Sequence, residues 1–173
     1  MEEKDAKLFV NAPNTLDGNS TAKCNTASAK FQSEEAGIVD GIGSEDEVIA
    51  KIRDLLTYLP NNNEDDDSYQ ECTDDLNRVC EGIEGANGDT SILISNIADN
   101  AAFFEIKPDY AKDVVCGFIR MNGQTVGVVA NRTEIIGEDG KATEKFEGMS
   151  AQGCEKAASL VDFCDSFNIP VVT

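Results

Sequence analysis

Residues 103–132 read FFEIKPDYAKDVVCGFIRMNGQTVGVVANR, and they carry the clearest secondary-structure signal in the chain. Two apolar runs rich in β-branched residues, Asp113 to Met121 and Gln124 to Ala130, flank the dipeptide Asn122-Gly123. A type I′ turn needs positive φ at both central residues, which Asn and Gly adopt at low cost, so the stretch predicts a β-hairpin. Apolar residues outnumber polar ones on both strands. We therefore expect both faces of the hairpin to be covered inside a larger sheet.

Composition narrows the class of protein. The chain has 173 residues, 40% of them hydrophobic, which suffices for one good core or two modest ones. Fourteen basic and 33 acidic residues give a net charge of −19. Nucleic acid and anionic membrane surfaces both bind basic footprints, so neither is an expected partner. The first ten residues, MEEKDAKLFV, are acidic, and no apolar run is long enough to span a membrane. We expect a soluble protein without a signal peptide or direct membrane insertion.

Much of the negative charge lies in one segment. It contains seven acids within twelve positions, namely Glu64, Asp65, Asp66, Asp67, Glu71, Asp74 and Asp75. A solvated acidic loop is the favoured interpretation. Calcium binding is the alternative, but the segment has no Asp-x-Asp-x-Asp-Gly loop followed by a distal Glu.

Histidine is absent, and this removes both the commonest general base and the commonest metal ligand. A Ser-His or Cys-His nucleophile cannot be assembled from this chain alone. The six cysteines form no Cys-x-x-Cys pair and have no zinc-ligand spacing; they are Cys24, Cys72, Cys80, Cys116, Cys154 and Cys164. We interpret them as reduced, core-filling thiols in a cytoplasmic protein.

The clearest helix is predicted from Glu45 to Leu59. Ser44 and Glu47 form a capping box, apolar residues recur at positions i, i+3, i+4 and i+7, and Pro60 ends the pattern. We expect the apolar face of this helix to be buried. The next thirty residues, Asn61 to Thr90, are rich in Asn, Asp, Glu and Gly, which is typical of a linker between two units.

A second long helix is predicted from Ser150 or Ala151 to about Phe167, with a strand beginning at Val171. Its expected buried side comprises Ala157, Ala158, Leu160, Val161, Cys164 and Phe167. Shorter predicted elements are strands at Leu8 to Val10 and Ile38 to Val39, helices at Thr21 to Ala36 and Ser91 to Ala98, a possible short helix at Leu76 to Ile83, and an exposed excursion from Thr133 to Gly148. The order strand, strand, helix, strand predicts an α/β fold in which ββα units wind into a spiral.

Few residues stand out as binding groups. Gly41-Ile42-Gly43 precedes a capped helix, but Glu45 and Glu47 place negative charge there, so phosphate binding is not favoured. Near the hairpin entry, we interpret the acids Glu105, Asp109 and Asp113 as surface residues.

Two arginines are more informative. Arg120 and Arg132 each lie at or near the end of an apolar strand, where a guanidinium could meet a carboxylate or a phosphate. Structural ion pairs with the surrounding acids are favoured over substrate contacts for both.

The hairpin region also carries a family resemblance. The pattern F-F-E-I-x-P-x-Y-A-K-x-x-V-x-G-x-x-R-M-N-G-x-T-V-G-V-V-A-N resembles the carboxyltransferase β-type subunits of biotin-dependent acyl-CoA carboxylases and decarboxylases. Propionyl-CoA, methylmalonyl-CoA and glutaconyl-CoA enzymes belong to that group. The similarity continues at QGCEKAA (152–158), FCDSFNIP (163–170), IRDLLTYLP (52–60) and DLNR (75–78).

The resemblance implies parts of two crotonase-like domains built of ββα spiral turns. Residues 1–60 correspond to the C-terminal part of the N-terminal, acyl-CoA-side domain, 61–90 to an acidic linker, and 91–173 to the N-terminal part of the C-terminal, biotin-side domain. It also implies an acyl-CoA substrate, biotin on a biotin carboxyl carrier protein, and a homo-oligomer of the full-length parent. Two oxyanion holes of backbone N–H groups, with no histidine base, would stabilise the enolate and the biotin ureido oxygen.

The chain departs from the family pattern because neither oxyanion-hole donor pair matches a segment within it. We therefore expect a fragment of a carboxyltransferase that is inactive alone and holds no catalytic residue. Arg120, Asn131 and Arg132 are the residues expected closest to a substrate on the biotin side. The alternative is a non-catalytic association module of a larger acyl-CoA carboxylase-like assembly, whose apolar faces bind a partner chain.

Overall fold

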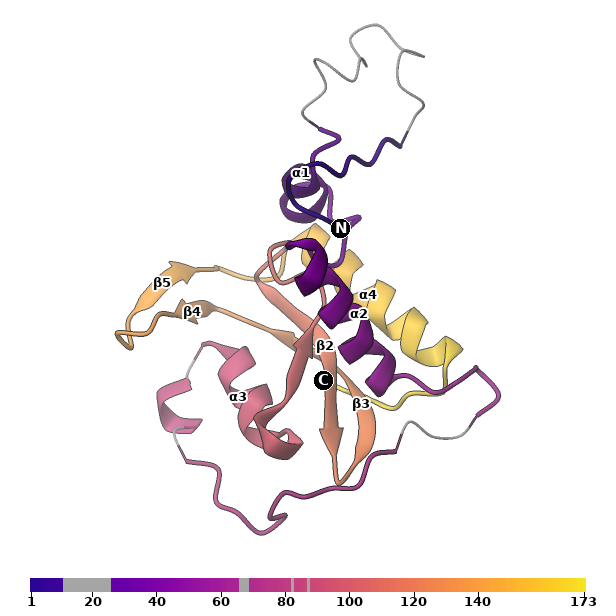
Figure 1. Ribbon diagram of the computed structural model, residues 1–173. Helices are drawn as coiled ribbons and strands as arrows, with labels where there is room; N and C mark the ends of the chain where they lie inside the picture. Colours follow the sequence, from indigo (N-terminus) through magenta and orange to yellow (C-terminus); the bar gives the residue numbers. More distant parts are fainter. Residues whose placement is uncertain (11–25, 66–68, 82, 87) are drawn as a thin grey trace, which may run out of the picture.

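A four-stranded sheet forms the centre of the computed structural model, which describes residues 1–10, 26–65, 69–81, 83–86 and 88–173 (Figure 1). Its strand order is β1-β2-β3-β6, with bounds β1 Phe103–Glu105, β2 Val114–Met121, β3 Gln124–Asn131 and β6 Val171–Val172. β2 pairs antiparallel with β1 on one side and with β3 on the other, whereas β6 adds parallel to β3. The sequence prediction of a hairpin inside a larger sheet is confirmed.

The hairpin turn is the predicted Asn-Gly pair. Asn122 has φ 52° and Gly123 has φ 81°, so both occupy the left-handed region that a type I′ turn requires. The buried carboxylate of Asp99 accepts hydrogen bonds from the N–H groups of Asn122 at 3.0 Å and Gly123 at 2.6 Å. This contact fixes the turn against the residues that follow helix α3 (Thr90–Ile97).

Both faces of the hairpin are covered, as predicted, because successive side chains point to opposite sides of a strand. On one face Val114, Cys116 and Phe118 pack with Leu160 and Cys164 of helix α4 (Ala151–Ser166). On the other face the core is formed by Val115, Ile119, Val126 and Val128 of the sheet with Ile94 of α3. Figure 1 shows α3 and α4 on opposite sides of the central strands.

Helix α2 (Glu45–Tyr58) matches its predicted bounds to within one residue and has the predicted capping box between Ser44 and Glu47. The expectation that its apolar face is buried is wrong for most of its length. Tyr58 is the one buried residue of the helix, whereas three large apolar side chains are exposed, namely Ile49, Ile52 and Leu56. The helix meets the sheet only through its last turn, where Tyr58 packs near the rings of Phe104 and Phe118.

Helix α4 also has its predicted bounds, but its buried side is narrower than expected. Gly153, Lys156, Leu160 and Cys164 are buried, at a spacing of three or four residues that forms one stripe along the helix. Ala158 and Val161 are exposed because they lie away from this stripe, so the prediction was wrong for them.

The outlying elements correct several predictions. They are helix α1 Ala29–Glu34, the 3₁₀ turns η1 Ile83–Ala86 and η2 Asp99–Ala101, and the strands β4 Glu134–Ile136 and β5 Ala142–Lys145. No strand forms at Leu8 to Val10; among the described residues, Lys7 forms an isolated bridge with Ser28, and the Leu8 N–H donates to the Ala27 carbonyl at 2.9 Å. The strand at Ile38 to Val39 is also absent, since both N–H groups donate to the carbonyl of Gln32 and close the end of α1. Residues 21–25 of the predicted first helix lie outside the described residues.

The excursion at 133–148 is confirmed as an exposed two-stranded arm, which projects from the body in Figure 1. A short helix was predicted at Leu76 to Ile83, but residues 76–81 form none, and the 3₁₀ turn η1 begins at Ile83.

Part of the acidic segment is fixed in place. Asp74 forms an ion pair of 2.9 Å with Arg78 and accepts the N–H of Asn100, while the Arg78 Nη2 donates to the Ala98 carbonyl at 2.8 Å. The backbone hydrogen bond from Asn100 and the contact with Arg78 lower the pKa of Asp74. Glu64, Glu71 and Asp75 are exposed as predicted, and Asp66 and Asp67 lie outside the described residues.

Candidate functional site

A buried polar cluster lies where the hairpin opens, at the ends of β2 and β3 away from the turn. The pairing of Val114 with Asn131 places Asp113 next to Arg132, whose N–H donates to the Asp113 carbonyl at 2.8 Å. The Arg132 guanidinium is buried. It donates from Nε to the Lys112 carbonyl at 2.7 Å and lies 3.7 Å from Asp89 Oδ1. The predicted structural ion pair is thus confirmed for Arg132.

Asp89 connects three elements of the chain. Its carboxylate accepts the N–H and the hydroxyl of Ser91 at the start of α3, and it accepts the N–H of Ile136 in β4 at 2.9 Å. Its pair with Arg132 is nearly fully buried, with side-chain exposures of 4% and 6%. Removing one partner of such a pair leaves an uncompensated buried charge, so the pair fixes α3, β3 and β4 relative to one another.

Lys156 of α4 is the second buried cation. Its ammonium donates to the carbonyls of Lys107, Tyr110 and Val114 at 2.8 to 2.9 Å, which uses all three of its protons. Burial lowers the pKa of Lys156, although nearby Cys116 and Glu105 oppose this effect. The side chain therefore holds the loop before β2 against α4.

The three acids near the hairpin entry have different environments. Asp109 is exposed as predicted, but Asp113 is buried and accepts the N–H and hydroxyl of Ser150 at the start of α4. Glu105 is half-buried, and its Oε1 has no hydrogen-bond partner among the residues that the structure describes. Burial raises the pKa of Glu105, while the charges of Arg132 and Lys156 oppose the rise. The surface-acid interpretation is wrong for Asp113 and holds only in part for Glu105.

The three residues predicted to approach a substrate are not brought together. Asn131 and Arg132 are at the open end of the hairpin, whereas Arg120 pairs with Thr125 near the turn. Six residues of strand separate Val114 from Arg120, or about 20 Å at ~3.3 Å per residue. Asn131 is exposed, and its carbonyl accepts the hydroxyl of Thr90.

Arg120 contacts α2 rather than an acid. Its Nη2 donates to the carbonyl of Thr57 at 2.6 Å and to the Thr57 hydroxyl at 3.0 Å, and its guanidinium carbon lies 4.2 Å from the centre of the Tyr58 ring. No carboxylate lies within 4 Å of this guanidinium among the described residues. The predicted ion pair is absent for Arg120 in that part of the chain.

Two apolar cavities lie beneath α2. The larger, about 600 Å³, is between α2 and β1 and is lined by Val48, Ile52, Leu55, Phe103, Phe104 and Glu105 among others. The smaller, about 210 Å³, is between α2 and α4 and includes Phe118, Leu160 and Phe163. Leu55 and Ile106 line both cavities, so the two spaces are separated by few side chains.

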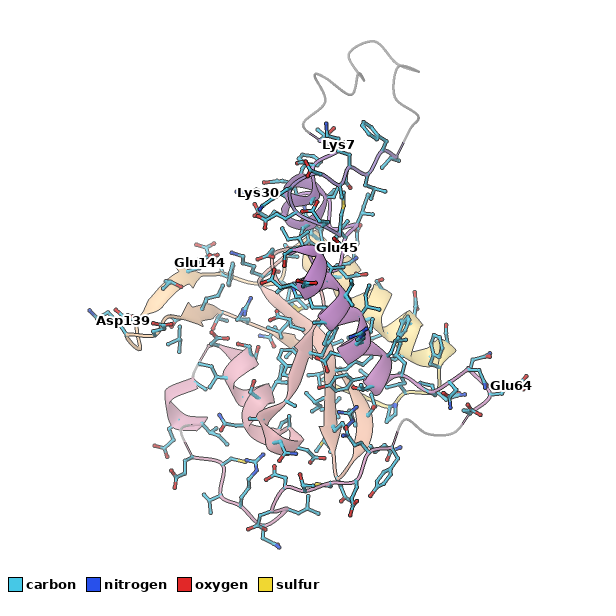
Figure 2. All side chains as sticks on the ribbon, viewed as in Figure 1. Lys7, Lys30, Glu45, Glu64, Asp139 and Glu144 are labelled. Carbon is cyan, nitrogen blue, oxygen red and sulfur yellow. The ribbon has the colours of Figure 1, made fainter. Side chains whose placement is uncertain are left out.

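The remaining charge is carried on the outside, as the labelled Glu45, Glu64, Asp139 and Glu144 show in Figure 2. Within the described ranges, no group of three or more Cys, Asp or Glu side chains could hold a metal ion. No helix in that part of the structure is long and apolar enough to cross a membrane.

The five described cysteines are free. Cys116 and Cys164 are buried as predicted, whereas Cys154 is exposed, contrary to the core-filling interpretation.

Sequence reasoning missed the polar residues that fix this region. Asp89 precedes the predicted helix at Ser91 to Ala98, and Lys156 lies within the predicted helix that begins at Ser150 or Ala151; the sequence pattern assigns neither residue a role outside its helix. A charged residue that falls within an otherwise apolar stripe is the signal that could have identified them. Such a residue is rarely buried unless it is paired, so it indicates a buried polar contact.

A helix-covered hairpin with a parallel strand added after α4 defines a mixed α/β protein. The buried charges described above contact groups of the sheet and its neighbouring loops. The chain belongs to the carboxyl transferase domain family, which matches residues 3–173. The predicted resemblance to carboxyltransferase subunits of acyl-CoA carboxylases is therefore confirmed.

Individual relatives agree with this family. The chain is 31% identical over 184 residues to the propionyl-CoA carboxylase beta chain of Cereibacter sphaeroides, covering 100% of the chain and 34% of the relative. It is 30% identical over 181 residues to the methylmalonyl-CoA carboxyltransferase 12S subunit of Propionibacterium freudenreichii subsp. shermanii, covering 98% and 32%. The chain thus spans about a third of the length of the curated relatives it matches.

Solved structures agree as well. A transcarboxylase 12S crystal structure with methylmalonyl-coenzyme A bound superposes with a TM-score of 0.79 at 28% identity, over 99% of this chain and 33% of the other. A single-chain, multi-domain long-chain acyl-CoA carboxylase shares the fold with a TM-score of 0.67 at 20% identity, over 98% of this chain and 16% of that one.

Proposed function

We propose that this chain is part of a carboxyltransferase that moves a carboxyl group between carboxybiotin and an acyl-CoA, in the carboxylase or decarboxylase direction. The observation that carries the proposal is the coincidence of the family match over residues 3–173 with a superposition of 99% of the chain on transcarboxylase 12S. The hairpin β2–β3 is the structural centre of this part, since both cores are built on it.

The proposal includes two crotonase-like domains. Residues 1–60 would belong to the end of the acyl-CoA-side domain, 61–90 to the linker, and 91–173 to the start of the biotin-side domain. The order β2, β3, α4 and β6, with β6 parallel to β3, supports a ββα spiral turn in the last segment.

Among the described residues, the two arginines predicted on the biotin side are both engaged by the chain itself. The guanidinium of Arg132 is engaged by Asp89 and the Lys112 carbonyl, and that of Arg120 by Thr57 and the Tyr58 ring. Of the three predicted residues, only Asn131 is exposed. We therefore propose that Arg120 and Arg132 position the sheet, and that substrate is held by groups outside these three residues. Biotin, carried by a biotin carboxyl carrier protein, would supply the carboxyl group.

In this proposal the parent protein is a cytoplasmic homo-oligomer that acts on an acyl-CoA thioester. The 173 residues alone are inactive, because neither backbone donor pair that the resemblance implies falls within them.

The purified chain tests this directly. Incubated with ¹⁴C-carboxybiotin and propionyl-CoA, it is expected to transfer no label to the thioester, with the Propionibacterium 12S subunit as the active control. Labelled methylmalonyl-CoA above the protein-free background would contradict the expected inactivity.

A second candidate function is a non-catalytic association module of a larger acyl-CoA carboxylase-like assembly. The exposed apolar residues Ile49, Ile52 and Leu56 on α2 favour it, because a row of such side chains at helical spacing is typical of an interaction surface. An inactive chain is expected under both functions, so a second measurement is needed to separate them.

A further inference from the structure

We infer that loop 107–114 forms a binding site for a primary ammonium group, and that Lys156 of α4 is the built-in occupant of this site. The loop leads from β1 into β2, so its position affects the central sheet directly. The site is independent of the proposed carboxyltransferase function. It accepts a free ammonium ion of matching size once the lysine side chain is shortened.

The first supporting observation is the arrangement of three carbonyl oxygens. Those of Lys107, Tyr110 and Val114 lie 2.8, 2.9 and 2.9 Å from the Lys156 Nζ. These are the distances of charge-assisted hydrogen bonds, and an ammonium group has three N–H donors to make them. Lys156 is only 3% exposed, so protein groups surround the ammonium. The three oxygens therefore form a cage that fits one ammonium group.

The second observation is the backbone conformation of the loop. Lys107 has φ 51° and Ala111 has φ 43°, and both lie in the left-handed region that non-glycine residues rarely adopt. Residues in this region persist only where the surrounding structure fixes them. Lys107 supplies one cage oxygen, and Ala111 directly follows Tyr110, which supplies another. The cation at the centre of the cage therefore holds the loop in a strained conformation.

The charged groups around the cage include several that favour a cation. Burial lowers the pKa of Lys156, and the charge of Arg132 acts in the same direction. Cys116, Glu105 and Asp113 act in the opposite direction and favour the protonated lysine. Carbonyl oxygens with carboxyl groups nearby are suited to a positively charged occupant.

The cage also joins two parts of the chain. The Lys107 N–H donates to the Asp40 carbonyl at 3.0 Å, and the two side chains form an ion pair of 3.8 Å. The Tyr110 ring lies against Gly37 so closely that a methyl group there would overlap it. Residues 37–40 thus rest on the loop that Lys156 holds. Loss of the ammonium is expected to weaken the attachment of this segment as well as the loop itself.

A neighbouring cavity provides a route into the cage. The cavity of about 210 Å³ between α2 and α4 is lined by Lys156, Lys107 and Ser159 among others. The Lys156 side chain borders this cavity and ends in the cage. Shortening the side chain to alanine therefore connects the two spaces, and a small ammonium ion can then enter.

Thermal unfolding of the purified Lys156→Ala chain tests the inference. The variant is expected to unfold at least about 5 °C below the wild type, because three carbonyls lose a charged donor. Added ethylammonium chloride is expected to recover at least about half of this shift, because a ligand that binds only the folded state stabilises it. Tetramethylammonium chloride at the same concentration supplies the same charge without an N–H donor, and it is expected to recover none.

Lys156→Met is the matched control, because its side chain fills the route to the cage without supplying an ammonium. Neither this variant nor the wild type, whose cage is already occupied, is expected to respond to ethylammonium. The inference is overturned if ethylammonium fails to stabilise Lys156→Ala, or if tetramethylammonium stabilises it equally. It is also overturned if Lys156→Met or the wild type gains as much as Lys156→Ala.

Should Lys156→Ala fail to fold, NMR of the wild-type chain labelled with ¹⁵N-lysine decides the question. The Lys156 ammonium signal is assigned by its absence from Lys156→Met. Its protons are expected to exchange with water at least about tenfold more slowly than those of Lys30, whose side chain is 73% exposed. Exchange as fast as that of Lys30 would show that no cage encloses the ammonium.

Discussion

Single residues in this chain show how burial changes the role of a charged group. Asp89, Asp113, Arg132 and Lys156 are buried, and each is satisfied by main-chain groups from other elements. The sequence indicated that arginines at strand ends would meet acids, and this is correct for Arg132. It could not identify Asp89 as the partner, since 43 positions separate them and only the fold brings them together.

Glu105 is half-buried, and it leads to a pH-dependent prediction. Burial raises its pKa above the ordinary value of 4.5, so the folded chain holds this proton more firmly than the unfolded chain does. Its contribution to stability is then greatest below pH 4.5 and declines as the pH rises above that value. Glu105→Gln removes the ionisable group, so the variant does not lose this stability as the pH rises. We expect the free energy of unfolding of the variant to exceed that of the wild type at pH 8, and by a smaller margin at pH 5, measured by urea unfolding.

Asp109→Asn is the matched control, because Asp109 is an exposed acid four positions along the chain. Its free energy of unfolding is expected to stay within about 0.5 kcal/mol of the wild-type value. A Glu105→Gln variant that is less stable than the wild type at pH 8 would show that the ionised carboxylate is stabilised in the fold.

Individual elements were predicted well where the pattern was local. The hairpin turn, the capping box of α2 and the bounds of α4 all depend on a few neighbouring residues. Prediction failed where contacts with distant segments decide the outcome. The apolar face of α2 was expected to be buried, but sequence periodicity specifies only which side chains share a face and not whether a surface covers it. Likewise, Lys156 occupies the buried stripe of α4 because three carbonyls of the loop 107–114 receive its protons.

The close packing of α4 on β2 leads to a second prediction. A methyl group at Gly153 would lie 2.6 Å from Asp113 Oδ2 and 2.7 Å from Val114 Cγ2. Asp113 cannot move without losing its hydrogen bonds to Ser150. Gly153→Ala is therefore expected to destabilise the chain by about 1–3 kcal/mol in urea unfolding, although alanine favours helix over glycine by ~1 kcal/mol.

Gly148→Ala provides the comparison, because a methyl group at Gly148 would meet nothing within 4 Å. This variant is expected to have the stability of the wild type to within about 0.5 kcal/mol. If Gly153→Ala were as stable as Gly148→Ala, α4 would not pack on β2 as closely as described.

At the scale of the whole molecule, the hairpin β2–β3 is the centre of the described structure. Its two cores share the hairpin β2–β3, its buried charges are used internally, and its exposed surface is strongly acidic. The fold class and the family could be predicted from the sequence because the hairpin and its flanking segments carry a specific pattern. The arrangement of Arg120, Asn131 and Arg132 could not, because it depends on which end of the hairpin each residue occupies.

Carboxyl transfer by a chimera would show whether this chain is a working part of a carboxyltransferase. The matching third of the Propionibacterium methylmalonyl-CoA carboxyltransferase 12S subunit is replaced by this chain, and transfer of label from carboxybiotin to propionyl-CoA is assayed. If the chain is a competent part of a carboxyltransferase, the folded chimera is expected to retain activity within about tenfold of the parent subunit, a barrier change of ~1.4 kcal/mol. A chimera that folds and assembles like the parent but transfers no label would contradict that account and favour the association module.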